Sequence, residues 1–349
     1  MRGKWSAAVV LGLTAVLTTG CTLVGGGSND DAGATVTLVT HDSFAAPQQV
    51  LDAFQQQTGI KIAVLKKGDA GALTNSLVLT KANPIGDVAY GIDSTFASRA
   101  LSEGIFESYT SPEADRGPQR YAVDSEHRMS AVDLGDVCLN VDTNWFTERN
   151  LPAPTGYDDL TDPRYKDLLV VENPATSSPG LAFLLGTIAK YGEQGWQAYW
   201  QKLKDNGVQS VSGWEEAYGQ DFSGSSGKGP LPIVVSYASS PAAEIGDDGK
   251  PRTKALLDTC YRQVEYAGVL AGTKQADKAH KVIDFLLSQQ FQATVADSMY
   301  VYPARDGVAL PKAWADAAPL PRDSASLPAD QVQSGRERWI GQWRSLLGQ

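Results

Sequence analysis

Histidine, cysteine and methionine are scarce in this sequence, because each occurs only three times among 349 residues. The histidines His41, His127 and His280 form no HExxH pair, and no cysteine stands at metal-ligand spacing from them. A GxSxG nucleophile motif is also missing. These absences argue against the common zinc-hydrolase and serine-hydrolase sites. We therefore expect no catalytic residues, no metal site, no cofactor and no enzyme activity.

Basic residues are outnumbered, with 30 Lys and Arg against 40 Asp and Glu, so the formal charge is −10. An acidic chain lacks the basic surface that binds phosphate backbones, which excludes nucleic acid as a partner. The charge balance suits a solvated protein outside the cytoplasm and a cationic ligand.

A long apolar run is lacking as well, since the apolar segment Trp5–Leu17 is shorter than the roughly 18 residues that span a bilayer. It follows two basic residues and leads through small residues to Cys21, which is the order of a secretory signal peptide at residues 1–20. A cysteine directly after glycine resembles a lipobox, although Thr18 stands where an aliphatic residue is usual. We predict that Cys21 is lipidated and that residues 21–34 form a flexible tether. The alternative is an ordinary signal peptide with an unrelated cysteine.

Roughly 315 residues remain beyond the tether, enough for two packed lobes. Hydrophobic periodicity predicts strands at Val36–Thr40, Ile60–Leu65, Asp87–Ile92, Val132–Val141, Leu168–Val171, Ile233–Ser236 and Gln263–Leu270. It predicts helices at Pro47–Gln57, Gly71–Ala82, Ser94–Glu103, Pro179–Tyr191, Trp196–Lys204, Ala276–Leu287 and Gln331–Leu347. This alternation indicates an α/β fold with a mostly parallel sheet, and no linker divides it into sequential domains.

Polar residues follow three of these segments, at the points where strands end. Ligands of open α/β sheets bind beyond the carboxyl ends of the strands. The candidates are therefore His41, Asp42, Ser43, Asp93, Thr176 and Ser177. Ser178 suits the N-cap and Pro179 the first turn of the helix that follows, and such a helix start offers free N–H groups to an anion or a polar group. Most Ser-Pro helix starts, however, are only caps.

Aromatic residues form a second group of candidates. Trp214 and Tyr218 are four residues apart in a glycine-flanked segment, so they share one face of a helix. Tyr237 ends a buried strand among hydroxyl side chains, and Tyr300 precedes a further tyrosine by two residues. Aromatic faces bind flat cations. The competing explanation for each of these residues is core packing.

Two cysteines, Cys138 and Cys260, remain in the mature chain. In an oxidising compartment such a pair forms a disulfide, or it consists of two separate buried thiols. The sequence leaves both alternatives open.

Several of these segments occur together in a recognisable order. They are Thr40–Phe44, Gly91–Asp93, Pro174–Gly180, Gly213–Gly219, Ser236–Pro241 and Tyr302–Pro303. In this order the chain resembles the thiamine-binding proteins of ABC importers, over roughly residues 35–347. The resemblance implies the two-lobed type II periplasmic-binding-protein fold, with interleaved lobes at 35–133 and 134–264 and a return to lobe 1 with C-terminal helices at 265–349. It also makes Val132–Val141 and Gln263–Leu270 the hinge strands, so a disulfide between Cys138 and Cys260 would connect them.

The same resemblance implies roles for individual residues. Trp214, Tyr237 and Tyr300 would contact the thiamine rings, and Asp93 would face the aminopyrimidine. Ser177 and His41 would lie near the hydroxyethyl or phosphate end. The sequence departs from the family where His41 replaces a tyrosine, where Tyr300 replaces a tryptophan and where Ala243 replaces an aromatic residue of some relatives. Preference among thiamine and its phosphates therefore stays open.

The resulting expectation is a monomeric lipoprotein on the extracytoplasmic face of the cell membrane that captures thiamine or its phosphates and delivers them to an ABC permease. The alternative is another cargo of the same fold, such as ferric iron, a phosphonate or a polyamine. Iron would require clustered tyrosines with a histidine or carboxylate, whereas Tyr300 and Tyr302 are not adjacent in the sequence. A thiamine-degrading enzyme would require a nucleophilic cysteine, whereas Cys138 and Cys260 fall in or beside predicted strands.

Overall fold

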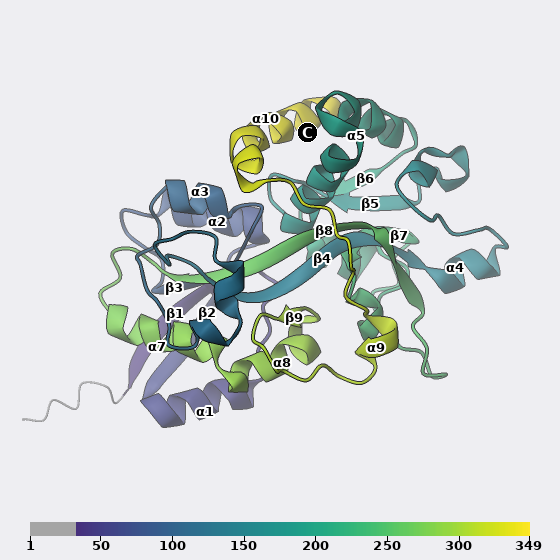
Figure 1. Ribbon diagram of the computed structural model, residues 1–349. Coiled ribbons are helices and arrows are strands. Elements are labelled where there is room, and N and C mark those ends of the chain that lie inside the picture. Colours follow the sequence, from purple (N-terminus) through teal and green to yellow (C-terminus); the bar gives the residue numbers. More distant parts are fainter. Residues whose placement is uncertain (1–32) are drawn as a thin grey trace, which may run out of the picture.

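Two long antiparallel strands, β4 (Ser130–Asp142) and β8 (Thr253–Val269), run through the centre of the computed structural model (Figure 1). The structure describes residues 33–349, so the predicted signal peptide, Cys21 and most of the tether lie outside the described residues. The nine-stranded sheet has the order β2-β1-β3-β8-β4-β7-β5-β6, with β9 paired to β4. Because β4 and β8 contribute to both halves of this sheet, the fold is α/β with two lobes joined by crossing strands.

The remaining strands are β1 (Ala34–Thr40), β2 (Ile60–Lys66), β3 (Val88–Asp93), β5 (Leu169–Glu172), β6 (Gln209–Val211), β7 (Ile233–Tyr237) and β9 (Tyr302–Pro303). The helices are α1 (Gln48–Thr58), α2 (Ala70–Leu79), α3 (Ala97–Ser102), α4 (Thr143–Glu148), α5 (Ser178–Asp205), α6 (Trp214–Glu216), α7 (Ala276–Leu287), α8 (Gln289–Met299), α9 (Trp314–Ala317) and α10 (Ala329–Leu347). Strands β1, β2 and β3 pair in parallel in the first lobe, and β5, β6 and β7 pair in parallel in the second. Among the described residues, no helix is both long and apolar enough to cross a membrane.

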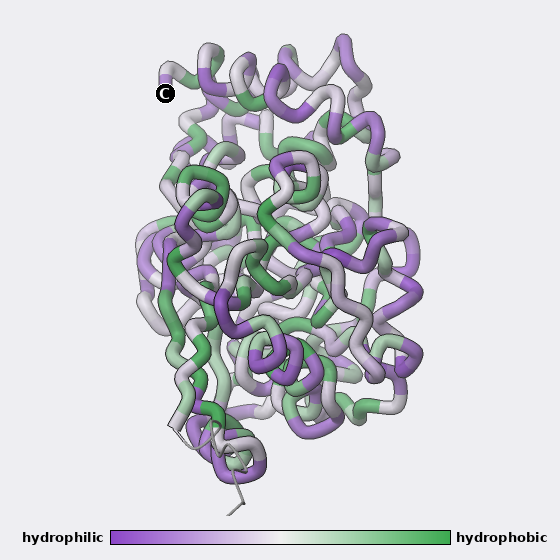
Figure 2. The backbone as a smooth tube through the Cα atoms, turned by 90° about the vertical axis from the view of Figure 1, so that its left-hand side faces the viewer, coloured by the Kyte–Doolittle hydropathy of each residue, from purple (hydrophilic) through white to green (hydrophobic). Residues whose placement is uncertain are grey.

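Each lobe has its own packed aromatic residues. In the first lobe, Phe54 of α1 packs against Phe285 of α7, with 4.6 Å between the ring centroids. In the second, Trp200 of α5 meets Trp343 of α10 edge to face at 5.5 Å. Helix α10 therefore covers α5, after the chain has crossed from β9 along the hinge strands (Figure 1). Apolar stretches lie mostly inside and hydrophilic stretches mostly along the outer loops and helices (Figure 2).

Several boundaries differ from the predicted ones. The two helices predicted between residues 179 and 204 are present as the two parts of α5, which a kink at Gly192, with a φ of 72°, separates. Strand β8 begins ten residues before its predicted start. The short elements α4, β6, α9 and β9 and the helix α8 were not predicted, because their sequences show no clear hydrophobic periodicity. The expectation that Ser178 is the N-cap of α5 is wrong. Ser177 has the extended backbone of a cap, and its side chain accepts a hydrogen bond from the N–H of Gly180.

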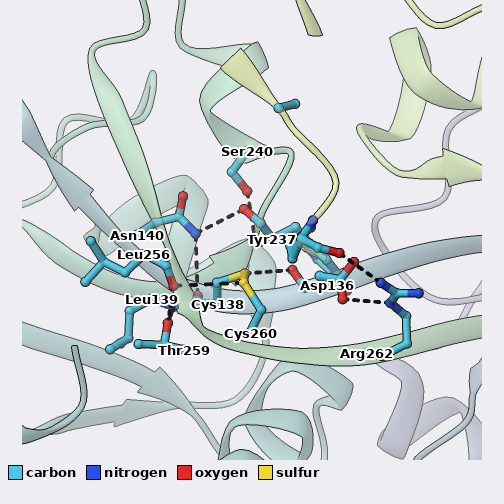
Figure 3. The surroundings of a disulfide bond; sticks show 12 residues. Asp136, Cys138, Leu139, Asn140, Tyr237, Ser240, Leu256, Thr259, Cys260 and Arg262 are labelled. Carbon is cyan, nitrogen blue, oxygen red and sulfur yellow. Dashed lines mark hydrogen bonds and ion pairs between the residues drawn. A yellow bond between two sulfur atoms is a disulfide. The ribbon is translucent and has the colours of Figure 1, made fainter. Parts of the chain in front are cut away.

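A disulfide joins Cys138 of β4 to Cys260 of β8, across 122 residues of sequence (Figure 3). Both cysteines are buried. Strand β8 bulges at this point, because Val137 pairs with Tyr261 whereas Leu139 pairs with Leu256. The bond therefore fastens the two strands that both lobes share, at the place where their hydrogen-bonded register is interrupted.

Candidate functional site

A small cavity of about 40 Å³ lies where the two lobes meet. Its lining comes from the ends of β1 and β7, the starts of α2 and α6, the middle of β8 and the segment after α8. The lining residues are His41, Ser43, Asp69, Trp214, Tyr237, Ser240, Glu265, Met299, Tyr300 and Val301. We call this space the interlobe cavity.

A wider hollow of about 790 Å³ lies along the β8 segment Lys254–Asp258, but none of the predicted ligand-binding residues lines it.

Five of the predicted ligand-binding residues line the interlobe cavity: His41, Ser43, Trp214, Tyr237 and Tyr300. They come from β1, α6, β7 and the C-terminal end of α8, elements that are far apart in the sequence. The remaining five predicted residues lie beside the cavity and support it.

The side chains of Asp42 and Thr176 form hydrogen bonds with backbone groups. The Asp42 carboxylate accepts a hydrogen bond from the N–H of Gly68 at 2.9 Å. The Thr176 hydroxyl donates to the carbonyl of Ser212 at 2.6 Å. Both bonds fix loops that border the cavity.

Asp93, Ser177 and Tyr218 are buried behind the cavity wall. Asp93 accepts hydrogen bonds from the Thr95 hydroxyl at 2.8 and 3.0 Å, and burial raises the pKa of Asp93 to about 8. Tyr218 stacks on Trp214 with 4.9 Å between the ring centroids and 11° between the planes. The shared face predicted for these two aromatics therefore exists, with Tyr218 as the inner partner.

Sequence reasoning missed the cavity residues Asp69, Ser240, Glu265, Met299 and Val301. Asp69 follows the carboxyl end of β2, so the rule applied to the other strands would have selected it. Glu265 and Gln263 are polar residues at alternate positions of the otherwise apolar segment Gln263–Leu270, which places both on one face. Ser240 lies inside a quoted motif. Met299 and Val301 carried no sequence signal that distinguished them from core residues.

Asp69 connects the two lobes. It is the N-cap of α2 and accepts a hydrogen bond from the N–H of Ala70 at 2.6 Å. Its second carboxylate oxygen accepts from the N–H of Trp214 at 3.0 Å, across the cleft. A side chain on Gly213 would approach the Asp69 carboxylate to 3.2 Å, so glycine permits this close contact. Burial raises the pKa of Asp69, while its hydrogen bonds with Ser177 and these backbone N–H groups favour the ionised form.

His41 and Glu265 face each other in the cavity, with 3.5 Å between Nε2 and Oε2. The His41 ring lies so close to Gly91, which has a φ of 101°, that a Cβ there would stand 2.0 Å from it. Burial alone lowers the pKa of His41, but the negative charges of Glu265 and Asp69 outweigh this effect and raise it overall. Burial alone raises the pKa of Glu265, but the positive charge of His41 contributes to lowering it overall.

A second carboxyl group lies behind this pair. The Tyr90 hydroxyl donates a short hydrogen bond to Asp133 and another, at 3.3 Å, to Glu265. Burial and the charge of Glu265 raise the pKa of Asp133 well above its usual value. The cavity wall carries two acidic side chains, Asp69 and Glu265, and one basic side chain, His41.

Aromatic faces form the other walls. The Trp214 indole N–H donates to the Ser236 hydroxyl at 2.9 Å, which fixes the ring plane. The rings of Trp214 and Tyr237 lie 6.3 Å apart at 59° to each other. Tyr300 ends α8 in the left-handed conformation, and its carbonyl accepts a hydrogen bond from the Ser239 hydroxyl. Aromatic faces beside excess negative charge are suited to a flat, positively charged ligand.

Metal-ligating side chains do not cluster in the part of the chain that the structure describes. Within residues 33–349, no group of three or more His, Cys, Asp or Glu side chains is placed to hold a metal ion. Tyr302 is buried and its hydroxyl donates to the carbonyl of Ala318 at 2.6 Å, whereas Tyr300 lines the cavity. The two tyrosines point to different sides because Tyr300 ends α8 in the left-handed conformation, whereas Tyr302 lies in β9.

Comparisons with known proteins agree on the type of protein. Residues 83–328 match the family described as bacterial extracellular solute-binding protein. The thiamine-binding periplasmic protein of Salmonella typhimurium is 30% identical over 319 residues, which cover 89% of this chain and 93% of that protein. The protein of the same description from Brucella suis is 27% identical over 321 residues, covering 88% and 91%. A solved structure described as a periplasmic thiamin binding protein has a TM-score of 0.79 and 26% identity, covering 94% of this chain and 100% of that one.

Proposed function

This chain belongs to the bacterial extracellular solute-binding protein family, and we propose that the solute it captures outside the cytoplasm is thiamine, which it delivers to an ABC permease. The observation that carries this proposal is the interlobe cavity, where Trp214, Tyr237 and Tyr300 surround a space that also holds the carboxylates of Asp69 and Glu265. The names of the similar proteins support the same ligand. In this proposal the chain binds its solute without transforming it.

The chemistry of thiamine fits the cavity in three respects. Its thiazolium ring carries a fixed positive charge, which aromatic faces and carboxylates attract. Its aminopyrimidine offers hydrogen-bond donors and acceptors, for which Ser43 and Ser240 are available on the cavity wall. Nanomolar capture requires about −12 kcal/mol. Several aromatic contacts together with the desolvation that accompanies closure reach this magnitude, whereas one exposed ion pair contributes about 1 kcal/mol or less.

Isothermal titration of the mature chain, residues 22–349, tests the proposal. Thiamine, its monophosphate and its diphosphate are the three main ligands, and ferric citrate, a phosphonate and a polyamine are the competing ones. We expect tight binding of thiamine and no comparable heat from the competing ligands. Absence of thiamine binding, or tighter binding of a competing ligand, would contradict the proposal. Mass spectrometry of the recovered ligand tests whether it remains intact, because a thiamine-degrading enzyme would release fragments.

Asp69→Asn is expected to weaken thiamine binding about tenfold, or about 1.4 kcal/mol. Asparagine is an equally good N-cap, so its one acceptor keeps α2 capped, whereas the negative charge that faces the ligand and the hydrogen bond from the Trp214 N–H are both lost. Titration calorimetry and the melting temperature of the ligand-free variant measure the two effects separately.

The matched control is Asp142→Asn, because Asp142 caps α4 with hydrogen bonds from Asn144 and Trp145 and does not line the cavity. Equal loss of affinity in both variants would mean that Asp69 acts only through folding stability.

We also propose that Cys21 is acylated and holds the protein at the membrane. This proposal is supported by the order of basic residues, apolar segment, Cys21 and glycine-rich tether in the sequence. Cys21→Ala is expected to release the protein into the medium or to leave the precursor unprocessed. Cell fractionation and intact mass measure the outcome, and a membrane-bound variant of normal mature mass would refute lipidation.

A further inference from the structure

His41 is the only basic side chain among the described residues that line the interlobe cavity. It is 8% exposed, and its Nε2 atom has no hydrogen-bond partner, although it stands 3.5 Å from the Glu265 carboxylate. The contact is thus an ion pair without hydrogen-bond geometry, and it occupies the same negatively charged space that a cationic ligand would use.

The charged and titratable groups around His41 come from five elements. Glu265 on β8 and Asp69 at the start of α2 are the two carboxylates that face it. Lys66, at the end of β2, opposes them weakly, because its ammonium donates to the carbonyl of Asp42 at 2.6 Å. Tyr90 on β3 lies 5.6 Å away from the His41 ring, centroid to centroid, and holds Asp133 of β4 behind it. The surroundings therefore favour an imidazolium as long as no other cation enters.

We propose that His41 is a resident cation that a permanently charged ligand displaces, so that binding of thiamine releases a proton from this histidine. This inference rests on the proposed function. Before binding, one positive charge, on His41, stands beside Glu265 and Asp69. As the thiazolium enters, the imidazolium gives one proton to solvent and becomes neutral, and the ligand supplies the positive charge in its place. The net charge of the cavity is the same before and after, and two cations never share the poorly solvated space.

A pH dependence of affinity follows. At low pH His41 must lose its proton before the ligand binds, so affinity falls by up to tenfold for each unit of pH. At high pH His41 is already neutral, and the affinity becomes constant. Because the pKa of His41 is raised, the rise in affinity extends above the ordinary histidine value of about 6.5.

Titration calorimetry in two buffers of different protonation enthalpy measures the number of protons released. We expect close to one proton for each thiamine bound at about pH 6, and a number that falls toward zero at about pH 8.5. A neutral analogue, in which a thiophene replaces the thiazolium, should release none. His41→Gln should abolish both proton release and pH dependence while it still binds thiamine.

The matched control is His280→Gln, because His280 also stands beside a carboxylate, 3.9 Å from Glu107, but lies outside the cavity. This variant should behave like the parent. Thiamine binding without proton release, or with the same pH slope in His41→Gln, would overturn the inference and leave the proposed function intact. Absence of thiamine binding at every pH would overturn both.

Discussion

Trp214→Ala is expected to weaken thiamine binding by about 30- to 1000-fold, which corresponds to about 2–4 kcal/mol. The indole is one wall of the interlobe cavity, and its orientation is fixed by the hydrogen bond to Ser236 and by stacking on Tyr218. Alanine removes both the apolar contact and the ring face that attracts the thiazolium. The measurement is the dissociation constant of thiamine by titration calorimetry, paired with the melting temperature of the ligand-free variant.

The melting temperature of the ligand-free variant distinguishes a ligand contact from core packing. Trp214 is only partly buried, so its truncation should cost less than the roughly 3–5 kcal/mol of a fully buried tryptophan. Trp145→Ala is the matched control, because this tryptophan of α4 is also partly buried but lies outside the cavity. Trp214→Phe, which keeps an aromatic face, should recover much of the affinity. An unchanged affinity with a collapsed melting temperature would assign Trp214 to the core.

Removal of the disulfide is the second large effect. The double variant Cys138→Ala and Cys260→Ala is expected to lower the free energy of unfolding by about 2–5 kcal/mol. The bond closes a loop of 122 residues and so restricts the unfolded chain. Chemical denaturation, with and without reductant, measures the change. The parent protein should lose stability on reduction, whereas the double variant should be insensitive to reductant.

The same variant should retain thiamine affinity within a few-fold, because neither cysteine lines the interlobe cavity. Detection of two free thiols in the denatured, unreduced parent would contradict the presence of the bond.

The sequence by itself determined the fold class and most of the framework. Alternating strand and helix periodicity gave the parallel portions of the sheet, because hydrophobic periods of two and about 3.6 residues follow from local backbone geometry. Local chemistry marked Trp214, Tyr237 and Tyr300 as candidates but left core packing as the alternative, and the resemblance to thiamine-binding proteins implied their contact with the ligand. His41 and Ser43 followed from the rule for strand ends.

The tertiary structure decided which polar residues reach the ligand space. Asp93 and Asp69 both follow strands of the first lobe, yet Asp93 turns inward to Thr95 whereas Asp69 reaches across to Trp214. Glu265 lies within a strand that periodicity predicts only as a buried segment, and it becomes a site residue because β8 crosses between the lobes. The pairing of Cys138 with Cys260 was equally open in the sequence. The physical reason is common to these cases: propensity and periodicity act over a few residues, whereas side chains separated by more than a hundred residues meet only through the register of β4 with β8 and the closure of one lobe on the other.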